Sequence, residues 1–162
     1  MKQIEITSKI DVYSYDELSE IDKKLLEEAR KACDLSHSPY SHFKVGCAIR
    51  LQNGQSVIGA NQENASYPVC ICAEGVALSN ASMQYPNTSI DTMAITIKTP
   101  TNSSNSPVAP CGVCRQSISE YENRYNNNIR LILQGETGDI YILNSIKEIL
   151  PLGFGASDLI AK

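Results

Sequence analysis

The sequence predicts one α/β domain over residues 1–162, with a mixed sheet of about five strands covered by helices on both faces. Three observations indicate this fold. Segments with helical spacing of apolar residues alternate with segments in which every second residue is apolar. A chain of 162 residues, 42% of them hydrophobic, is long enough to bury a core of its own. No repeat, linker or change of composition divides it.

The first element is a helix expected over residues 14–33. Ser14 and Glu17 have the spacing of a capping box, in which each side chain bonds the backbone of the other. Apolar residues then recur at helical spacing, at Leu18, Ile21, Leu25, Ala29 and Cys33. A polar loop follows.

Five strands and three further helices are expected in the rest of the chain. The dipeptide Asn53-Gly54 predicts a hairpin turn between the first two strands. The Thr-, Asn-, Ser- and Pro-rich run 99–110 predicts a long loop, to which we assign no role. The strands are expected at residues 43–51, 57–61, 92–98, 129–134 and 139–143, and the helices at 72–83, 111–125 and 144–149.

Charge and hydropathy restrict the ligand and the location. The net charge is −4 and the longest basic run is Lys23-Lys24, whereas a polynucleotide enzyme usually carries a basic stripe. A small, weakly charged substrate therefore fits better than DNA or RNA. No apolar run reaches the length of a membrane span, and the N-terminus lacks the apolar block of a signal peptide. We expect a cytoplasmic protein that does not bind membranes.

Two cysteine motifs carry the chemistry. The first is Cys72-Ala73-Glu74, and the second contains Cys111 and Cys114. Together they offer three thiolates, which would leave a fourth position open, as in a catalytic metal site. All three cysteines fall at expected helix starts, where the helix dipole lowers the pKa of a thiol. Glu74 would lie in the first turn of its helix, close to the metal but not a ligand.

Other interpretations of the cysteines remain open. The C-x-x-C spacing of Cys111 and Cys114 also occurs in redox dithiols. Cys70 could complete a closed four-cysteine structural zinc site, although we expect its side chain to pack instead. Cys33 and Cys47 lie in apolar patterns and are expected to be buried. The only two histidines, His37 and His42, are expected on a surface loop and not at the metal.

With these motifs in place, the chain resembles the short, three-cysteine cytidine deaminases. The resemblance runs from about Tyr40 to Leu159 and consists of several blocks in the family's order. The blocks are Pro39-Tyr40-Ser41-His42-Phe43-Lys44-Val45-Gly46, residues 59–68, Cys72-Ala73-Glu74, Pro110-Cys111-Gly112-Val113-Cys114-Arg115-Gln116 and residues 150–155. It implies a three-layer α/β/α fold, Zn²⁺ held by Cys72, Cys111 and Cys114, and Glu74 as the catalytic proton shuttle.

The resemblance also implies roles for residues around the substrate. Asn61 and Glu63 would bind the ribose hydroxyls, Phe43 would line the pocket for base and sugar, and the backbone of Ala73 would contact the pyrimidine. Tyr67 and Phe154 would reach across subunit boundaries in a homotetramer with shared active sites. Read without the family, Phe43 could be core, and Asn61 and Glu63 could end a strand. The implied reaction is hydrolysis of cytidine and 2′-deoxycytidine to the uridine products and ammonia, in pyrimidine salvage.

One position departs from the family. Many short deaminases have arginine after the catalytic glutamate, where it offsets the thiolate charge, and this chain has Gly75. We expect Arg115 and the two helix dipoles to compensate. Three rival functions share the motifs: a deaminase of another cytosine compound such as blasticidin S, a polynucleotide deaminase, and a zinc-stabilised binding module that needs no Glu74. The acidic balance disfavours the polynucleotide deaminase.

Overall fold

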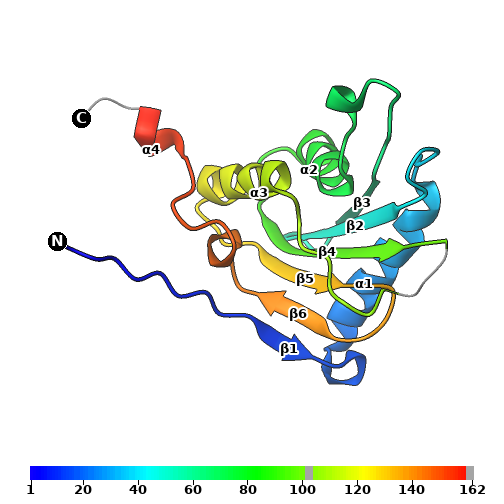
Figure 1. Ribbon diagram of the computed structural model, residues 1–162, viewed down its shortest axis with the longest axis horizontal. Helices are drawn as coiled ribbons and strands as arrows, with labels where there is room; N and C mark the ends of the chain where they lie inside the picture. The colour runs from blue at the N-terminus through cyan, green and yellow to red at the C-terminus, as the bar shows by residue number, and fades with distance from the viewer. Residues whose placement is uncertain (101–103, 160–162) are drawn as a thin grey trace.

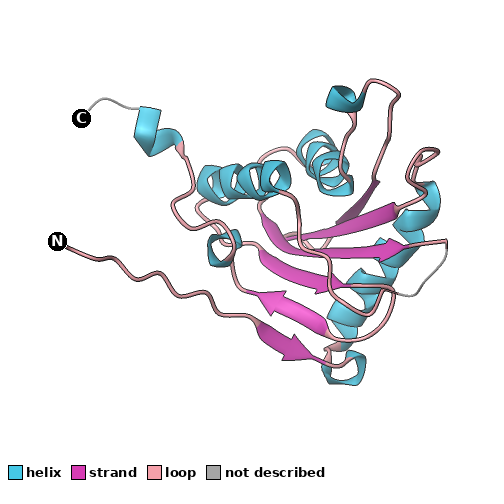
Figure 2. Cartoon of the chain, in the orientation of Figure 1, coloured by secondary structure: helices cyan, strands magenta, loops and turns pink. Residues whose placement is uncertain are grey.

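A computed structural model describes residues 1–100 and 104–159, and its central feature is a six-stranded mixed sheet (Figures 1 and 2). The strand order is β1-β6-β5-β4-β2-β3, and β4 and β5 form its parallel pair. The strands are β1 (Asp11–Tyr13), β2 (Lys44–Leu51), β3 (Ser56–Ala60), β4 (Ile90–Lys98), β5 (Arg130–Gln134) and β6 (Ile140–Leu143). The α-helices are α1 (Glu20–Ala32), α2 (Ala73–Gln84), α3 (Gly112–Tyr125) and α4 (Ala156–Leu159). The described residues also form four short 3₁₀ helices: η1 (Tyr15–Glu17), η2 (Cys33–Leu35), η3 (Tyr67–Val69) and η4 (Ile146–Glu148).

Helices cover both faces of the sheet, which confirms the predicted α/β architecture (Figure 1). On one face α1 packs Leu25, Leu26 and Ala29 against Ala94 and Ile132 of the sheet. On the other face the helices α2 and α3 pack on a larger core, whose fully buried members include Ile49, Met93, Ile95, Ile118 and Leu131. Alternate residues of each central strand thus supply the two cores, as the pleat of a strand requires.

The prediction of about five strands differs from the structure by one. The additional strand, β1, has three residues, pairs with β6 at one edge and leaves Val12 exposed. Apolar residues do alternate at Ile10 and Val12, but the strand is too short and too exposed for that pattern to predict it. The C-terminal α4 was not predicted either, and the helix expected at 144–149 is the shorter η4. The predicted loop at 99–110 contains residues 101–103, which lie outside the described residues.

The prediction of one helix over residues 14–33 is wrong. Ser14 and Glu17 do form a capping box, but it closes the single turn of η1, and the chain is extended again at Leu18. A second cap, Ser19, begins α1 by accepting a hydrogen bond from the N–H of Asp22. Ile21 accordingly lies on the outer side of α1, 56% exposed.

A buried carboxylate on α3 joins three parts of the second core. One oxygen of Glu122 accepts hydrogen bonds from the N–H groups of Ile129 and Ile146, at 2.9 and 3.0 Å. Its other oxygen accepts one from the Ser145 hydroxyl at 2.8 Å. These bonds fix the C-terminal half of α3 against the start of β5 and η4. Among the described residues, no helix is both long and apolar enough to cross a bilayer.

Candidate metal centre and active site

Three cysteine thiols converge where α2 and α3 begin. The sulfur atoms of Cys72 and Cys111 are 3.9 Å apart, those of Cys111 and Cys114 are 3.6 Å apart, and all three lie within 4.8 Å of one another. Three thiolates around a tetrahedral zinc, each about 2.3 Å from it, would have sulfur–sulfur separations of about 3.8 Å. The spacing therefore fits zinc with one position left for another ligand.

Local sequence places these thiols at helix starts, as predicted. Cys72 is the N-cap of α2 and Cys111 is the N-cap of α3, while Cys114 lies one turn into α3. The free N–H groups and positive dipole end of each helix favour anionic ligands. Within the cluster, the hydrogen bond from Cys114 lowers the pKa of the Cys72 thiol to about 6, against burial and the charge of Glu74, which raise it. The neighbouring cysteines alone thus favour the thiolate form of Cys72 at neutral pH.

Glu74 lies beside the cluster with its side chain buried. It is 4% exposed in the first turn of α2, and this burial raises the pKa of its carboxyl above the ordinary value. Cys47 lies behind it in β2, fully buried, and burial also raises the pKa of that thiol. A carboxyl that is more basic than usual suits a group that must both take up and release a proton.

The cluster opens into a cavity of about 320 Å³. Glu74 and Ala73 form part of its wall, and the predicted substrate residues Asn61, Glu63 and Tyr67 also line it. The remaining lining is largely apolar and comes from separate segments: Val45, Gln62, Cys70, Ile71, Ile95, Val108 and Ala109, with Cys72 and Cys111. Val108 and Ala109 belong to the loop at residues 99–110, to which the sequence assigns no role. Their closeness in sequence to Cys111 is the signal that could have placed them at the cavity.

The side chains of Asn61 and Glu63 hold the loop before β2. The Asn61 carbonyl oxygen accepts hydrogen bonds from the Val45 N–H at 2.8 Å and the Ser36 hydroxyl at 2.6 Å, and its amide group donates to the Phe43 carbonyl at 2.9 Å. Glu63 accepts hydrogen bonds from the Ser41 hydroxyl and from the N–H groups of Tyr40 and Ser41. The bonds from Ser41 and Tyr40 lower the pKa of the Glu63 carboxyl.

Two predicted contact residues lie outside the cavity of their own chain. Phe43 is 37% exposed at the start of β2, and Phe154 is 56% exposed in the C-terminal segment. The Phe154 carbonyl accepts a hydrogen bond from the side-chain amide of Gln116, in α3, at 2.8 Å. Tyr67 lines the cavity but remains 71% exposed, with its ring edge-on to that of Tyr40.

Arg115 contacts carbonyl groups and not the cysteine sulfurs. Its Nε donates to the carbonyl oxygen of Pro110, and its Nη1 donates to that of Ile149, both at 2.8 Å. The guanidinium thus joins the residue before Cys111 to the segment after η4. Arg115 therefore positions the residue before Cys111, a role that the expected compensation of thiolate charge did not include. The helix starts of the prediction are both present.

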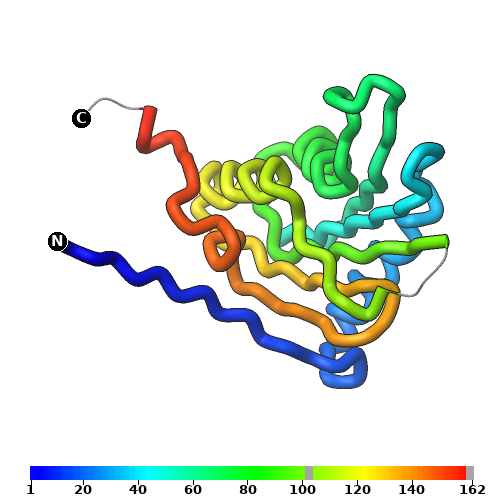
Figure 3. Tube along the Cα trace, viewed as in Figure 1, coloured from blue at the N-terminus to red at the C-terminus, as the bar shows by residue number. Residues whose placement is uncertain are grey.

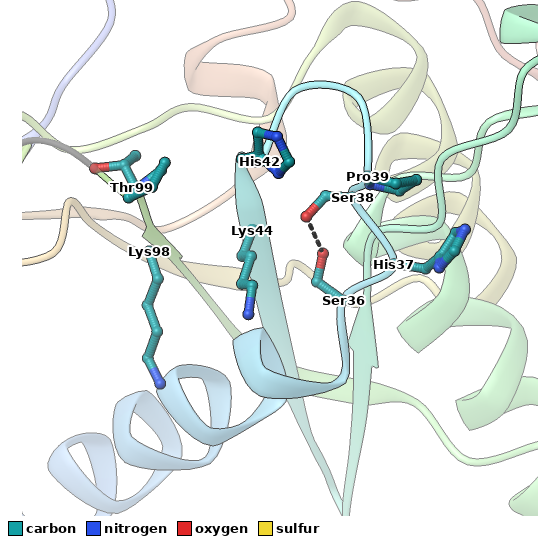
Figure 4. Close-up of a pocket in the computed structure, with 9 residues that line it drawn as sticks. Ser36, His37, Ser38, Pro39, His42, Lys44, Lys98 and Thr99 are labelled. Carbon is teal, nitrogen blue, oxygen red and sulfur yellow. Dashed lines mark hydrogen bonds between the residues drawn. The ribbon is translucent and has the colours of Figure 1, made fainter.

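A second cavity, of about 520 Å³, lies on the other side of the loop before β2. Figure 4 shows His37 and His42 among the residues that line it, with the hydrogen-bonded hydroxyls of Ser36 and Ser38, 3.2 Å apart, between them. Both histidines are exposed and neither belongs to the cysteine cluster, as expected. No cysteine lines this second cavity, so the cavity of about 320 Å³ beside the cysteine cluster is the candidate active site.

Of the remaining cysteines, two behave as predicted and one does not. Cys33 and Cys47 are completely buried. Cys70 is exposed and its sulfur accepts a hydrogen bond from the Asn64 N–H at 3.2 Å, so the expectation that it packs is wrong. Among the described residues the metal-binding cluster contains Cys72, Cys111 and Cys114 without Cys70, which disfavours a closed four-cysteine site.

Comparisons with known proteins agree with this geometry. Residues 19–126 match the sequence model of the cytidine and deoxycytidylate deaminase zinc-binding region. The cytidine deaminase of Halalkalibacterium halodurans is 37% identical over 135 residues, which are 83% of this chain and 95% of that protein. The cytidine deaminase of Sporosarcina psychrophila is 34% identical over 85% of this chain and 93% of its own. The crystal structure of cytidine deaminase from Burkholderia pseudomallei superposes with a TM-score of 0.71 at 32% identity, covering 85% of this chain and all of the other.

The fold and the open three-thiol cluster define the class: an α/β protein with a candidate cysteine-rich metal site at two helix starts. The comparisons define it further. The chain belongs to the cytidine and deoxycytidylate deaminase family.

Proposed function

We propose that this chain catalyses the zinc-dependent hydrolysis of cytidine and 2′-deoxycytidine to uridine and 2′-deoxyuridine, with release of ammonia. The observation that supports this most directly is the open cluster of three thiols beside the buried carboxyl of Glu74. The cavity that both face, about 320 Å³, falls in the size range of small-molecule sites. The family that the chain belongs to and the names of its relatives, which are cytidine deaminases, support cytidine as a substrate.

Cys72, Cys111 and Cys114 are the proposed zinc ligands. Their spacing and their places at two helix starts support this assignment. When bound, zinc supplies Lewis acidity that makes water a better nucleophile near neutral pH. The chain's own contribution is to hold three thiols together beside the cavity, whose wall includes Cys72 and Cys111.

Glu74 is the proposed proton carrier. Its carboxylate takes a proton from the attacking water and delivers it to the ring nitrogen N3 as oxygen bonds to C4. The carboxylate then takes the remaining proton from the new hydroxyl on C4 and carries it to the exocyclic amine, which leaves as ammonia when the C4–N4 bond breaks and the C4 carbonyl forms. One group serves both transfers because it lies between nucleophile and leaving group, and its raised pKa suits both directions.

The proposed substrate contacts surround this carboxyl. Asn61 and Glu63 bind the ribose hydroxyls, with the hydrogen-bonding capacity that their contacts to the loop leave free. The backbone of Ala73, in the cavity wall, contacts the pyrimidine, whereas Phe43 lies outside the cavity of its own chain and is not proposed as a contact there. The same contacts disfavour a cytosine compound that lacks a ribose, such as blasticidin S.

We further propose a cytoplasmic homotetramer of single-domain subunits that acts in pyrimidine salvage. Exposure of Tyr67 and Phe154 supports a shared active site, since each aromatic ring is available to a neighbouring subunit. In this arrangement Phe154 packs on the base bound by a neighbour.

A substrate panel on zinc-loaded protein tests the proposal. Cytidine, 2′-deoxycytidine, free cytosine, cytidine monophosphate and blasticidin S are compared by the ultraviolet change that accompanies deamination. We expect turnover of the two nucleosides at far higher kcat/KM than the other three. Preferred turnover of blasticidin S or of free cytosine would contradict the ribose contacts of Asn61 and Glu63, and no turnover of any compound would favour a zinc-stabilised binding module.

A further inference from the structure

The chain begins with an extended arm, residues 1–13, that ends in β1. Figure 3 shows the arm leaving the edge of the sheet and running away from the body of the molecule. Its base is fixed, because the Lys9 N–H donates to the Glu148 carboxylate at 2.8 Å and β1 pairs with β6. The family model matches residues 19–126, so the arm lies outside the matched region.

The arm has the side-chain pattern of a strand, and only residues 11–13 of it pair with a neighbouring strand. Ile4, Ile6, Ile10 and Val12 all have even numbers and therefore share one face of an extended chain. Their exposed fractions are 84%, 51%, 41% and 58%. β1 stands at the end of the strand order, so its outer edge has no strand beside it in the described part of the chain. An exposed edge of this kind is a template for a further strand.

We propose that the arm pairs with the same arm of a second copy, antiparallel, about a two-fold axis at Thr7. In this register each residue lies opposite the residue of the second arm whose number, added to its own, gives 14. Ile4 then lies opposite Ile10 on one face, and Glu5 lies opposite Lys9 on the other. Each contact occurs twice by symmetry, so the pairing gains two apolar pairs and two ion pairs.

Charge selects this register over its neighbour. A two-fold axis at Ser8 also keeps the even-numbered side chains on one face and makes four apolar pairs instead of two. It loses both ion pairs, however, and places Glu5 opposite Asp11 twice, and like charges directly opposite destabilise a sheet. In the single chain Lys9 lies 3.4 Å from Asp11, but its side chain is 76% exposed, so that surface contact is weak and Lys9 is available to a partner. The joined arms would link two sheets edge to edge.

Disulfide trapping tests the pairing at its axis. Residues directly opposite in an antiparallel pair have Cα atoms about 4.5 or 5.5 Å apart, within the range that a disulfide spans. Thr7→Cys should therefore form a reducible covalent dimer under mild oxidation of the full-length, zinc-loaded protein. Mass spectrometry of the non-reduced digest should join two copies of the peptide that carries position 7. The matched control is Ser8→Cys, which should crosslink poorly.

Charge exchange tests the contact between Glu5 and Lys9. In the Thr7→Cys background, Glu5→Lys or Lys9→Glu should each slow crosslinking about tenfold at fixed protein concentration, because both symmetric ion pairs become like-charge pairs. The double exchange should restore the rate. Lys24→Glu on the outer side of α1 is the charge control and should leave the rate unchanged. Crosslinking at position 8 in preference to 7 would overturn the register, and absence of the crosslink at both positions would overturn the pairing.

Discussion

Gly59 in β3 lies directly against Ala73, in the first turn of α2. A Cβ atom at residue 59 would be 2.4 Å from the Ala73 carbonyl oxygen and 2.4 Å from the Ala77 nitrogen. Only glycine allows the helix to approach the sheet this closely. Since Ala73 lies between Cys72 and Glu74, this contact sets the depth at which the cysteine cluster and the Glu74 carboxyl lie.

Gly59→Ala should therefore harm both stability and the metal centre. Backbone atoms cannot move aside as a flexible side chain does, so we expect a loss of about 1–3 kcal/mol in the free energy of unfolding and less bound zinc. Urea unfolding and metal analysis of the purified variant measure the two effects. Gly112→Ala is the control, because a Cβ there has no atom within 4 Å. Equal zinc content in the Gly59→Ala variant and the wild type would contradict the account.

Arg115 should act by position and not by charge. Its two hydrogen bonds to the Pro110 and Ile149 carbonyls need the forked guanidinium. Arg115→Lys keeps the charge but cannot make both bonds, so we expect zinc affinity to fall about 10–100-fold, as for other groups that orient metal ligands. Competition with a chelator measures this affinity. Full affinity in Arg115→Lys, with loss in Arg115→Gln, would show that charge compensation is the main role.

Gly75→Arg should change activity without disturbing the fold. A Cβ at residue 75 would meet only the Ile71 methyl carbon, at 3.4 Å, so there is room for a side chain. A cation there would lie one residue from Glu74 and three from Cys72, and we expect kcat/KM and its pH profile to differ from those of the wild type. Gly75→Ala separates the effect of the added carbon from that of the charge. An unchanged rate and pH profile would show that the helix starts compensate completely.

Asp22 should make stability fall in acid. Burial raises the pKa of its carboxyl, but hydrogen bonds from Arg130 and Ser19 and the charges of Arg130 and Arg50 outweigh this and lower it below the ordinary value. The stabilisation is therefore complete above the pKa of the unfolded chain, about 3.9, and is lost as the pH falls through the lower pKa of the folded state. We expect Asp22→Asn to cost roughly 2 kcal/mol at pH 7 and clearly less at pH 3.

Denaturant unfolding of both proteins at several pH values measures this difference. Any effect of acid on the cysteine cluster is common to the wild type and Asp22→Asn, so the gap between them is the quantity to follow. Asp16→Asn, at an exposed position in η1, is the control and should show no such gap. A gap for Asp22→Asn that stays constant from pH 7 to pH 3 would contradict the sign derived above.

Local signals predicted most of the fold and the centre of the site. The five strands with clear alternation are present, and the Cys72 and Cys111 motifs fall at helix starts as expected. A prediction was wrong where a local signal was present but governed fewer residues than expected. The capping box at Ser14 and Glu17 is real, yet it closes one 3₁₀ turn because Ser19 provides a competing cap for α1.

Contacts between distant segments could not be predicted from the sequence. Asn61 bonds Ser36, Phe43 and Val45, which lie 16 to 25 residues away and come together only through the pairing of β2 with β3. Glu122 likewise accepts hydrogen bonds from Ile129, Ser145 and Ile146, which lie 7 to 24 residues further along the chain. No periodicity marks such residues, because their role depends on tertiary packing and not on local conformation.

Glu74→Gln tests the central claim most directly. Conversion of cytidine to uridine by zinc-loaded wild type and variant is followed in the ultraviolet, with zinc content and unfolding midpoint measured on the same preparations. The account predicts turnover by the wild type and its near-complete loss in Glu74→Gln, with zinc retained, because the amide cannot carry the proton. Undiminished turnover by a zinc-loaded Glu74→Gln protein would contradict the role of Glu74 as proton carrier, and no turnover of cytidine by the wild type would contradict the proposed reaction itself.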